Sequence, residues 1–439
     1  MATAADFDAV LAPHYRENGA GAAVAVRHKG SLIHAKGYGL ANVEWGEPID
    51  LDTVFRIGSI TKQFTAAAIM KLAEEGTLGI DDPIERHLPD YPVGARRITV
   101  RHLLHHTSGI RSYTSLSAWA EQMSLDKSVA QIIDVFKDLP LDFEPGEQFL
   151  YNNSGYLLLG AIIERLSGKD YGTYLKNTFF GPLGMASTRY LSEAPITPKR
   201  AAGYQLSDRE LINAMPLSMT WPHAAGALGS TVNDLLRWDE ALRGGEVVSP
   251  ASYAAMTTPG RLNNGEPTGY GFGLVTSEYR GRRGIGHGGG INGFVTNLAH
   301  WPDEDLTVVV LSNLVTFAVP QVSHALVRRA LGLEDTQRSP VSLDRAELER
   351  CAGAYRVGPA TLPFVAEAEG LRSAWPTPGS LLLPLAADTF FPQRDPEVTV
   401  TFKTLKGDAY QRVVLGGYGE PVTGERAPEP TEALEPAAG

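Results

Sequence analysis

A serine and a lysine three residues apart, Ser59 and Lys62, are the best candidates in this chain for covalent chemistry. On a helix, residues three apart lie on the same face, so the hydroxyl and the amine can meet. The stretch from Ala66 to Met70 holds no polar side chain, which is typical of a buried helix. Burial removes water from a lysine and favours its neutral form, which can then activate the serine as a nucleophile.

The same spacing recurs at Ser124 and Lys127, so the pattern alone is weak. Ser124 precedes a charged, amphipathic segment whose lysine is expected to face solvent, and we interpret it as an ordinary helix start. Ser59 differs because Gly58 permits a tight entry into the helix and because the helix itself is apolar.

Tyr151 and Asn153 form a second candidate group, on a predicted loop between the turn at 144–146 and a helix that begins near Tyr156. A tyrosine hydroxyl near Lys62 can be held as a phenolate, or it can relay a proton between nucleophile and leaving group. Asn153 offers a donor and an acceptor that can orient a substrate amide. Taken in isolation, an exposed tyrosine beside an asparagine helix cap is the simpler interpretation of this pair.

The third candidate group is His287 with the glycines Gly288, Gly289 and Gly290, at the end of a predicted strand. Glycines such as Gly288 and Gly289 let a substrate backbone lie against the strand edge. A backbone N–H from this run, together with that of Ser59, can form an oxyanion hole. For His287 alone, a polar residue at a strand end is the simpler interpretation.

No metal site or other cofactor is expected. The close histidines His102, His105 and His106 lack an accompanying carboxylate and histidine pattern of the kind that binds metals. The single cysteine, Cys351, excludes an internal disulfide and a thiolate metal cluster.

The composition indicates a globular protein without a nucleic-acid or membrane partner. The chain has 439 residues, 43% of them hydrophobic and 20% charged, which is enough for two domains with sizeable cores. Its net charge of −11 disfavours binding to nucleic acids and anionic membranes, which need a basic surface. The N-terminus lacks the pattern of a secretory signal, and no segment has the length of a membrane span, so a cytoplasmic location is expected.

The order of the predicted elements indicates an α+β fold. Strand patterns at 22–26 and 31–35 return at 284–287, 294–301 and 306–311, with helical patterns between the two groups. We therefore predict one antiparallel sheet, flanked by helices, that is built from both ends of residues 1–333. The helical middle forms a separate lobe and leaves a cleft beside the sheet.

Beyond this domain we predict a linker at 334–342 and a small antiparallel β-barrel at 343–418. Residues 419–439 are rich in Pro, Glu and Ala, and we expect them to form a disordered tail. The barrel is expected to cover part of the cleft or to mediate subunit contact in a homo-oligomer.

Together, and in this order, the three groups resemble the motifs of the penicillin-recognising serine hydrolases. That family includes class C β-lactamases, D,D-carboxypeptidases, esterases and D-aminopeptidases. Its motifs Ser-x-x-Lys, Tyr-x-Asn and Lys/His-x-Gly correspond to Ser59–Lys62, Tyr151–Asn153 and His287–Gly289. The resemblance extends over about residues 7–332 and implies the β-lactamase/transpeptidase-like fold, followed by the small barrel often appended to it.

The resemblance also implies a role for each residue. Ser59 is the nucleophile, Lys62 its activating partner, and Tyr151 the base that passes a proton to the leaving group and later activates water. Asn153 holds the acyl side of the substrate, and the N–H groups of Ser59 and Gly290 bind the oxyanion. The sequence leaves open whether Lys62 or Tyr151 takes the first proton.

His287 is a departure from the usual pattern, because most β-lactamases and D,D-carboxypeptidases of this kind have lysine there. Lysine is a fixed positive charge for a substrate carboxylate, whereas histidine is mostly neutral near pH 7. Its loss weakens carboxylate binding by about 1.5–3 kcal/mol. We therefore expect a serine hydrolase that acts through an acyl-enzyme on amide or peptide bonds, with D-amino-acid substrates as candidates. The alternatives are an esterase of the same fold, a β-lactamase or D,D-carboxypeptidase, and a catalytically silent ligand-binding protein.

Overall fold

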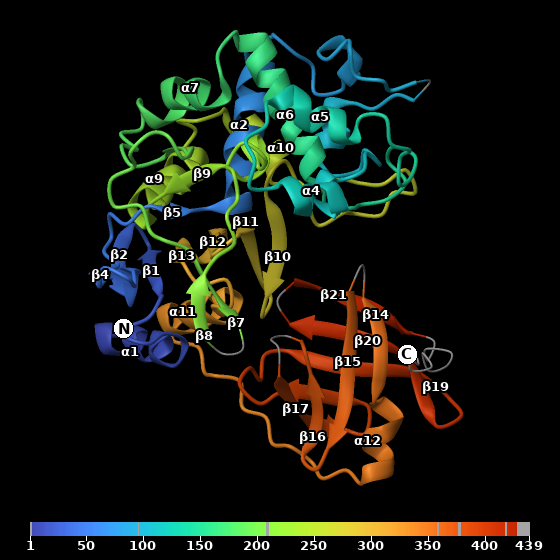
Figure 1. Cartoon of the computed structure of the whole chain (residues 1–439). Helices are drawn as coiled ribbons and strands as arrows, with labels where there is room; N and C mark the ends of the chain where they lie inside the picture. The colour runs from blue at the N-terminus through green and yellow to red at the C-terminus, as the bar shows by residue number, and fades with distance from the viewer. Residues whose placement is uncertain are drawn as a thin grey trace, which may run out of the picture. The chain divides into compact units, whose positions relative to one another are not determined.

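The computed structural model describes residues 2–94, 96–207, 210–357, 360–375, 379–417 and 419–427. The chain divides into two compact units, Met1–Leu333 and Glu334–Gly439 (Figure 1). Across the described ranges, no helix has both the length and the apolar character needed to cross a membrane.

An antiparallel sheet with the strand order β10-β11-β12-β13-β1-β2 forms the centre of the first unit. Its strands are β1 (Ala22–His28), β2 (Ser31–Tyr38), β10 (Val275–Tyr279), β11 (Arg282–Ile291), β12 (Phe294–Trp301) and β13 (Leu306–Ser312). The first strand pairs with the last along its whole length, from Ala22 opposite Ser312 to His28 opposite Leu306. The prediction of one sheet built from both ends of the domain is confirmed.

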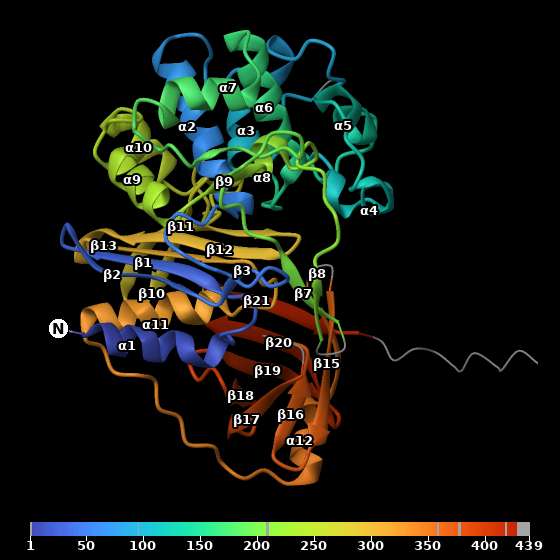
Figure 2. The ribbon, with the colours of Figure 1, turned by 60° about the vertical axis from the view of Figure 1, so that its left-hand side comes forward.

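Helices cover both faces of this sheet (Figure 2). On β1, Val24 and Val26 face a core shared with Leu326 of α11, whereas Ala23 and Ala25 face the larger core of the helical lobe. This alternation explains why β1 and β13 are apolar at most positions, since each face is buried against a helical layer. α1 (Ala4–Leu11) and α11 (Val319–Leu331) lie on one face, and α2 (Thr61–Glu74) and α9 (Val232–Arg243) lie on the other.

The helical lobe is built from the middle of the chain. Its helices are α3 (Val100–Leu104), α4 (Ser117–Gln122), α5 (Val129–Phe136), α6 (Asn153–Ser167), α7 (Tyr171–Leu175), α8 (His223–Gly226) and α10 (Pro250–Met256). α6 begins three residues earlier than predicted because the Asn152 side chain caps it, and it ends at Gly168 with a φ of 67°.

Short strands complete the first unit. They are β3 (Leu40–Asn42), β4 (Glu47–Pro48), β5 (Phe55–Arg56), β6 (Arg189–Tyr190), β7 (Tyr204–Ser207), β8 (Glu210–Asn213) and β9 (Leu228–Ser230). β9 pairs with β5, directly before the Ser59 segment, and thereby ties that segment to a distant part of the chain.

The interpretation of Ser124 as a helix start is wrong. Ser124 lies in a turn, and the helix that follows begins after Ser128, whose hydroxyl accepts a hydrogen bond from the backbone of Gln131. The Gln131 side chain bonds back to Ser128, so this capping box fixes the start of the helix four residues further on.

The second unit contains a closed antiparallel barrel, as predicted. Its strands are β14 (Gly353–Val357), β15 (Ala360–Glu367), β16 (Gly370–Ser373), β17 (Ser380–Ala386), β18 (Thr389–Pro392), β19 (Thr399–Lys406), β20 (Ala409–Gly417) and β21 (Gly419–Arg426). Helix α12 (Arg345–Cys351) precedes them. Tyr355, Phe364 and Phe402 meet edge to face in the core, so side chains fill the barrel.

The predicted start of the tail at residue 419 is wrong, because β21 closes the barrel by pairing with β20 and β14. The sequence of β21 contains glycine and proline, which are unfavourable in strands, so it does not predict a strand. Backbone pairing with the two neighbouring strands stabilises it instead. Residues 428–439 of the predicted tail lie outside the described residues. The segment predicted as a linker contains neither helix nor strand, and Val341 donates its N–H to Pro384 O of the barrel.

Candidate active site

Ser59 lies in a single 3₁₀ turn, Gly58–Ile60, that leads directly into α2. Gly58 has a φ of 52°, and a Cβ there would lie 3.0 Å from the backbone nitrogen of Gly290 on β11. Only glycine adopts this conformation easily and leaves room for such a close approach. Gly58 thus lets the Ser59 segment pack against the end of β11.

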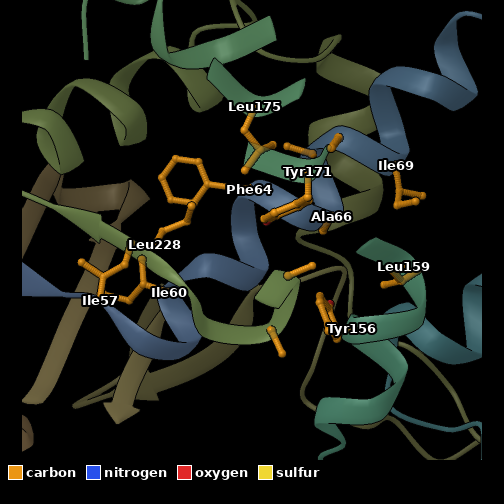
Figure 3. Close-up of a cluster of buried hydrophobic side chains, with 14 of the residues drawn as sticks. Ile57, Ile60, Phe64, Ala66, Ile69, Tyr156, Leu159, Tyr171, Leu175 and Leu228 are labelled. Carbon is orange, nitrogen blue, oxygen red and sulfur yellow. The ribbon is translucent and has the colours of Figure 1, made fainter. Parts of the chain in front are cut away.

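Helix α2 is buried on nearly every side, as its sequence predicts. Phe64 stacks on Trp238 of α9, with ring centroids 3.9 Å apart, and residues from Ala66 to Ile69 have no exposed surface. Figure 3 shows part of this cluster, in which Tyr156 of α6 and Tyr171 of α7 join the side chains of α2. The buried helix carries Lys62, which is itself fully buried.

The amine of Lys62 has three polar neighbours. Its Nζ lies 3.2 Å from Ser59 Oγ, 2.9 Å from Asn153 Oδ1 and 2.8 Å from the backbone oxygen of Ala225. The two carbonyl oxygens can only accept hydrogen bonds, so the N–H groups of the amine point toward them. A neutral amine has two such N–H groups, and its lone pair then faces the serine hydroxyl.

Burial lowers the pKa of Lys62 well below its ordinary value. Within the described part of the chain, no carboxylate lies within ion-pair distance of the amine to oppose this effect. The rings of Tyr151 and Tyr156 lie 4.7 Å and 5.4 Å from Nζ and favour the charged form by about 0.5–2 kcal/mol each. Desolvation of a buried ion costs several kcal/mol, so the neutral amine is favoured.

Tyr151 lies at the mouth of the site and contacts both Lys62 and Ser59. Burial raises the pKa of the Tyr151 phenol, and a hydrogen bond with the Ser59 side chain opposes this rise only in part. Tyr151 is 37% exposed, so solvent weakens the shift without reversing its direction. The phenolate alternative is therefore disfavoured, and a neutral phenol that can relay a proton is favoured.

Asn153 reaches into the site from the first residue of α6. The helix cap is its neighbour Asn152, whose side chain accepts from Gly155 N at 2.8 Å. The Asn153 side chain therefore does not cap the helix. Its Oδ1 accepts from Lys62, and its Nδ2 donates to Thr114 Oγ1 at 3.2 Å. The asparagine helix cap expected in this segment is therefore Asn152, and Asn153 is free to face the site.

His287 is buried beside the site, and both of its ring nitrogens have partners. Nδ1 donates to the carbonyl of Gly288, and Nε2 accepts from the Tyr270 hydroxyl at 2.9 Å. Burial, and to a lesser degree Lys62, lowers the pKa of His287 to about 3. The imidazole is therefore neutral and does not replace the lysine charge that related enzymes usually have at this position.

Two further residues of the site, Tyr270 and His106, are not predicted from the sequence. His106 is 1% exposed, and its ring centroid lies 4.4 Å from that of Tyr151 and 4.6 Å from that of Tyr270. These rings pack around the Tyr151 side chain and restrict its position. The sequence feature that could have pointed to Tyr270 is its position among the alternating glycines Gly269, Gly271 and Gly273.

A pocket of about 220 Å³, partly open to solvent, lies beside Ser59. Ser59, Asn153 and Gly290 all line it, so these three predicted residues come together at one surface. Gly288 and Gly289 are not among the lining residues. A Cβ on Gly289 would lie 2.1 Å from the carbonyl oxygen of Ile57, so this glycine serves the close packing of β11 on the Ser59 segment.

No metal is implied by the side chains that the structure describes, because no three of their His, Cys, Asp or Glu groups are arranged to hold one. The site contains instead a serine hydroxyl beside a buried amine, which in turn faces the ring of a tyrosine, on an α+β scaffold. This fold and this constellation define a serine hydrolase of the β-lactamase type. The chain belongs to the beta-lactamase family, whose sequence profile matches residues 7–333.

Three relatives illustrate the range of this family. The chain is 30% identical over 414 residues to penicillin-binding protein 4* of Bacillus subtilis, which covers 88% of this chain and 90% of that protein. It is 30% identical over 362 residues to a D-aminopeptidase of Gluconobacter oxydans, covering 80% of this chain and 67% of that protein. The structure of an octameric penicillin-binding protein homologue from Pyrococcus abyssi aligns with a TM-score of 0.68 and 28% identity, over 96% of this chain and 99% of that one.

Gly289→Ala is expected to lower the free energy of unfolding by about 1–3 kcal/mol, as overpacking of a core does. The new methyl group would lie 2.1 Å from Ile57 O and 2.2 Å from Thr296 Oγ1. Gly290→Ala is the matched control, because a Cβ there meets no atom within 4 Å, and its effect is expected to stay within about 0.5 kcal/mol. Urea denaturation followed by far-ultraviolet circular dichroism measures both, and equal losses would contradict this packing.

Proposed function

We propose that this serine hydrolase cleaves amide or peptide bonds of small substrates through an acyl-enzyme on Ser59, with D-amino-acid amides as one candidate class. The observation that carries the proposal is the fully buried Lys62 amine, 3.2 Å from Ser59 Oγ and without a carboxylate partner among the described residues. A D-aminopeptidase among the relatives supports the amide class.

In the first step, Lys62 Nζ accepts the proton of Ser59 Oγ as the oxygen attacks the substrate carbonyl carbon. The C–O bond forms, and the carbonyl oxygen becomes an oxyanion that the N–H groups of Ser59 and Gly290 stabilise. Asn153 donates from Nδ2 to the substrate, while its Oδ1 keeps the lysine in place. Because Lys62 is a neutral amine and Tyr151 a neutral phenol, Lys62 is the stronger base and is favoured as the first proton acceptor.

In the second step, the neutral phenol of Tyr151 gives its proton to the leaving nitrogen and regains one from the Lys62 ammonium. The oxyanion re-forms the C=O double bond as the C–N bond breaks, and the amine product leaves an acyl group on Ser59. Water then attacks the ester carbonyl and gives a proton to the active-site base through Tyr151. The ester C–O bond breaks, and Ser59 Oγ takes up that proton as the acid product leaves. An amine leaving group needs this protonation more than an alcohol does, so a phenol proton donor favours amides.

Ser59→Ala is expected to abolish labelling by a fluorophosphonate probe and to lower kcat by about 10⁴-fold or more. Intact mass spectrometry detects the adduct, and a matched pair of p-nitrophenyl ester and p-nitroanilide separates esterase from amidase activity. Ser124→Ala, in the second Ser-x-x-Lys sequence, is the control and should label as the wild type does. Absence of an adduct on the wild type, or an equal adduct on Ser59→Ala, would sink the proposal.

The rate of Ser59 acylation is expected to rise with pH and to level off well below pH 10.5, the ordinary pKa of lysine. Below the lowered pKa of Lys62 the amine is protonated and cannot accept the serine proton; above it the base is free. Stopped-flow measurement of probe labelling over pH gives this profile. Lys62→Arg, which stays protonated, should label slowly at every pH, and a wild-type rate that still climbs about tenfold per pH unit near pH 10 would exclude a neutral lysine base.

We also propose that the C-terminal barrel contributes to self-association. The support is the octameric penicillin-binding protein homologue, which aligns with 96% of this chain and so includes the barrel region. Analytical ultracentrifugation of the full chain is expected to give a multiple of the single-chain mass, and a monomer at all concentrations would contradict the idea.

A further inference from the structure

The pocket beside Ser59 carries no charged side chain among the residues described as its lining. Its walls are apolar or carry neutral amides and hydroxyls. The aromatic and aliphatic side chains are those of Tyr113, Trp119, Leu217, Pro222, Ala225 and Ile291. The polar side chains, apart from that of Ser59, come from Thr114, Asn153 and Asn292.

Lys62 and His287, the two basic residues predicted for the site, do not supply a positive charge to this pocket. Lys62 is fully buried behind Ser59, and its N–H groups are taken up by Asn153 Oδ1 and Ala225 O. The His287 ring is held between the Gly288 carbonyl and the Tyr270 hydroxyl, which leaves neither nitrogen open to a ligand. The Gly288 carbonyl and the Tyr270 hydroxyl thus occupy both ring nitrogens, and burial keeps the imidazole uncharged.

A charged group that enters such a pocket loses part of its water and gains no counter-ion from the described lining. An unpaired ion in an apolar site costs far more than a hydrogen-bonded neutral group, whatever its sign. The same walls therefore disfavour the carboxylate of a penicillin-like substrate and the free ammonium of an amino-acid amide. Apolar walls that include Trp119 and Tyr113 favour an apolar group of similar size.

We propose that the pocket beside Ser59 selects substrates whose acyl part is uncharged and apolar, such as arylacetyl amides or N-acylated amino-acid amides. This inference rests on the proposed function, since it names the acyl group that the acyl-enzyme carries. It narrows the D-amino-acid candidates to those whose α-amine is blocked.

Four p-nitroanilides with the same ring test this selection on the wild-type protein: phenylacetyl, phenylglycyl, phenylmalonyl and N-acetylphenylglycyl. They differ only at the carbon beside the carbonyl, which carries hydrogen, an ammonium, a carboxylate or a neutral amide. Assays at about pH 6 keep the amine protonated, because an α-amino group has an ordinary pKa of about 7.7. Both D and L forms are measured where the carbon is chiral.

The expected result is a kcat/KM for the two neutral substrates that exceeds that of each charged one by about tenfold or more. A phenylglycyl or phenylmalonyl anilide that is turned over as fast as the neutral pair overturns the inference. If none of the four is turned over but the fluorophosphonate probe labels Ser59, the inference fails and the proposed function stands. If the probe does not label Ser59, both fail.

Asn292→Asp provides a second test, because it places a carboxylate on the pocket wall with little change in volume. The ratio of phenylglycyl to phenylacetyl turnover should rise about tenfold, as expected for a new charge-assisted hydrogen bond to the substrate ammonium. Asn292→Ser is the matched control, since it also removes the hydrogen bond from Asn292 Nδ2 to Met215 O but adds no charge. Thermal melting checks that both variants fold, and an unchanged ratio in a folded Asn292→Asp would count against the inference.

Discussion

The burial of one amine without a counter-ion is the constraint on which the whole site depends. Lys62 has no exposed surface, and its nearest polar neighbours are a hydroxyl and two carbonyl oxygens. An ammonium in this place would lose its water and gain only ring faces and dipoles in return. The packing around α2 thus lowers the pKa of Lys62 and favours its neutral form, which is the form that can accept a proton.

Segments far apart in the chain create this environment. The end of β11 packs on the Ser59 turn because Gly58 and Gly289 leave room for it. Helix α6 contributes Asn153, and helix α8 contributes the carbonyl of Ala225. None of the described residues that line the pocket beside Ser59 has a charged side chain. A neutral amine and an uncharged pocket both follow from the scarcity of ionic groups among the described residues around Ser59.

Local patterns in the sequence predict much of this architecture. The apolar run after Lys62 predicts a buried helix, and alternation predicts β12 at its observed bounds, Phe294–Trp301. The sequence does not predict β21, because its strand character comes from neighbours on both sides. It also does not predict the pairing of His287 with Tyr270, because the orientation of two side chains across a folded core has no local signature. Motif spacing selects residues for the site, whereas packing decides their charge.

Direct titration of Lys62 tests the neutral-base mechanism most closely. Lysine labelled with ¹³C and ¹⁵N reports the protonation of each amine by nuclear magnetic resonance, and Lys62→Met identifies the Lys62 signal by its loss. Burial without a counter-ion predicts a neutral-amine signal at pH 7 that titrates far below 10.5, while exposed lysines titrate near that value. A Lys62 signal that remains that of an ammonium up to about pH 10 would contradict the central claim.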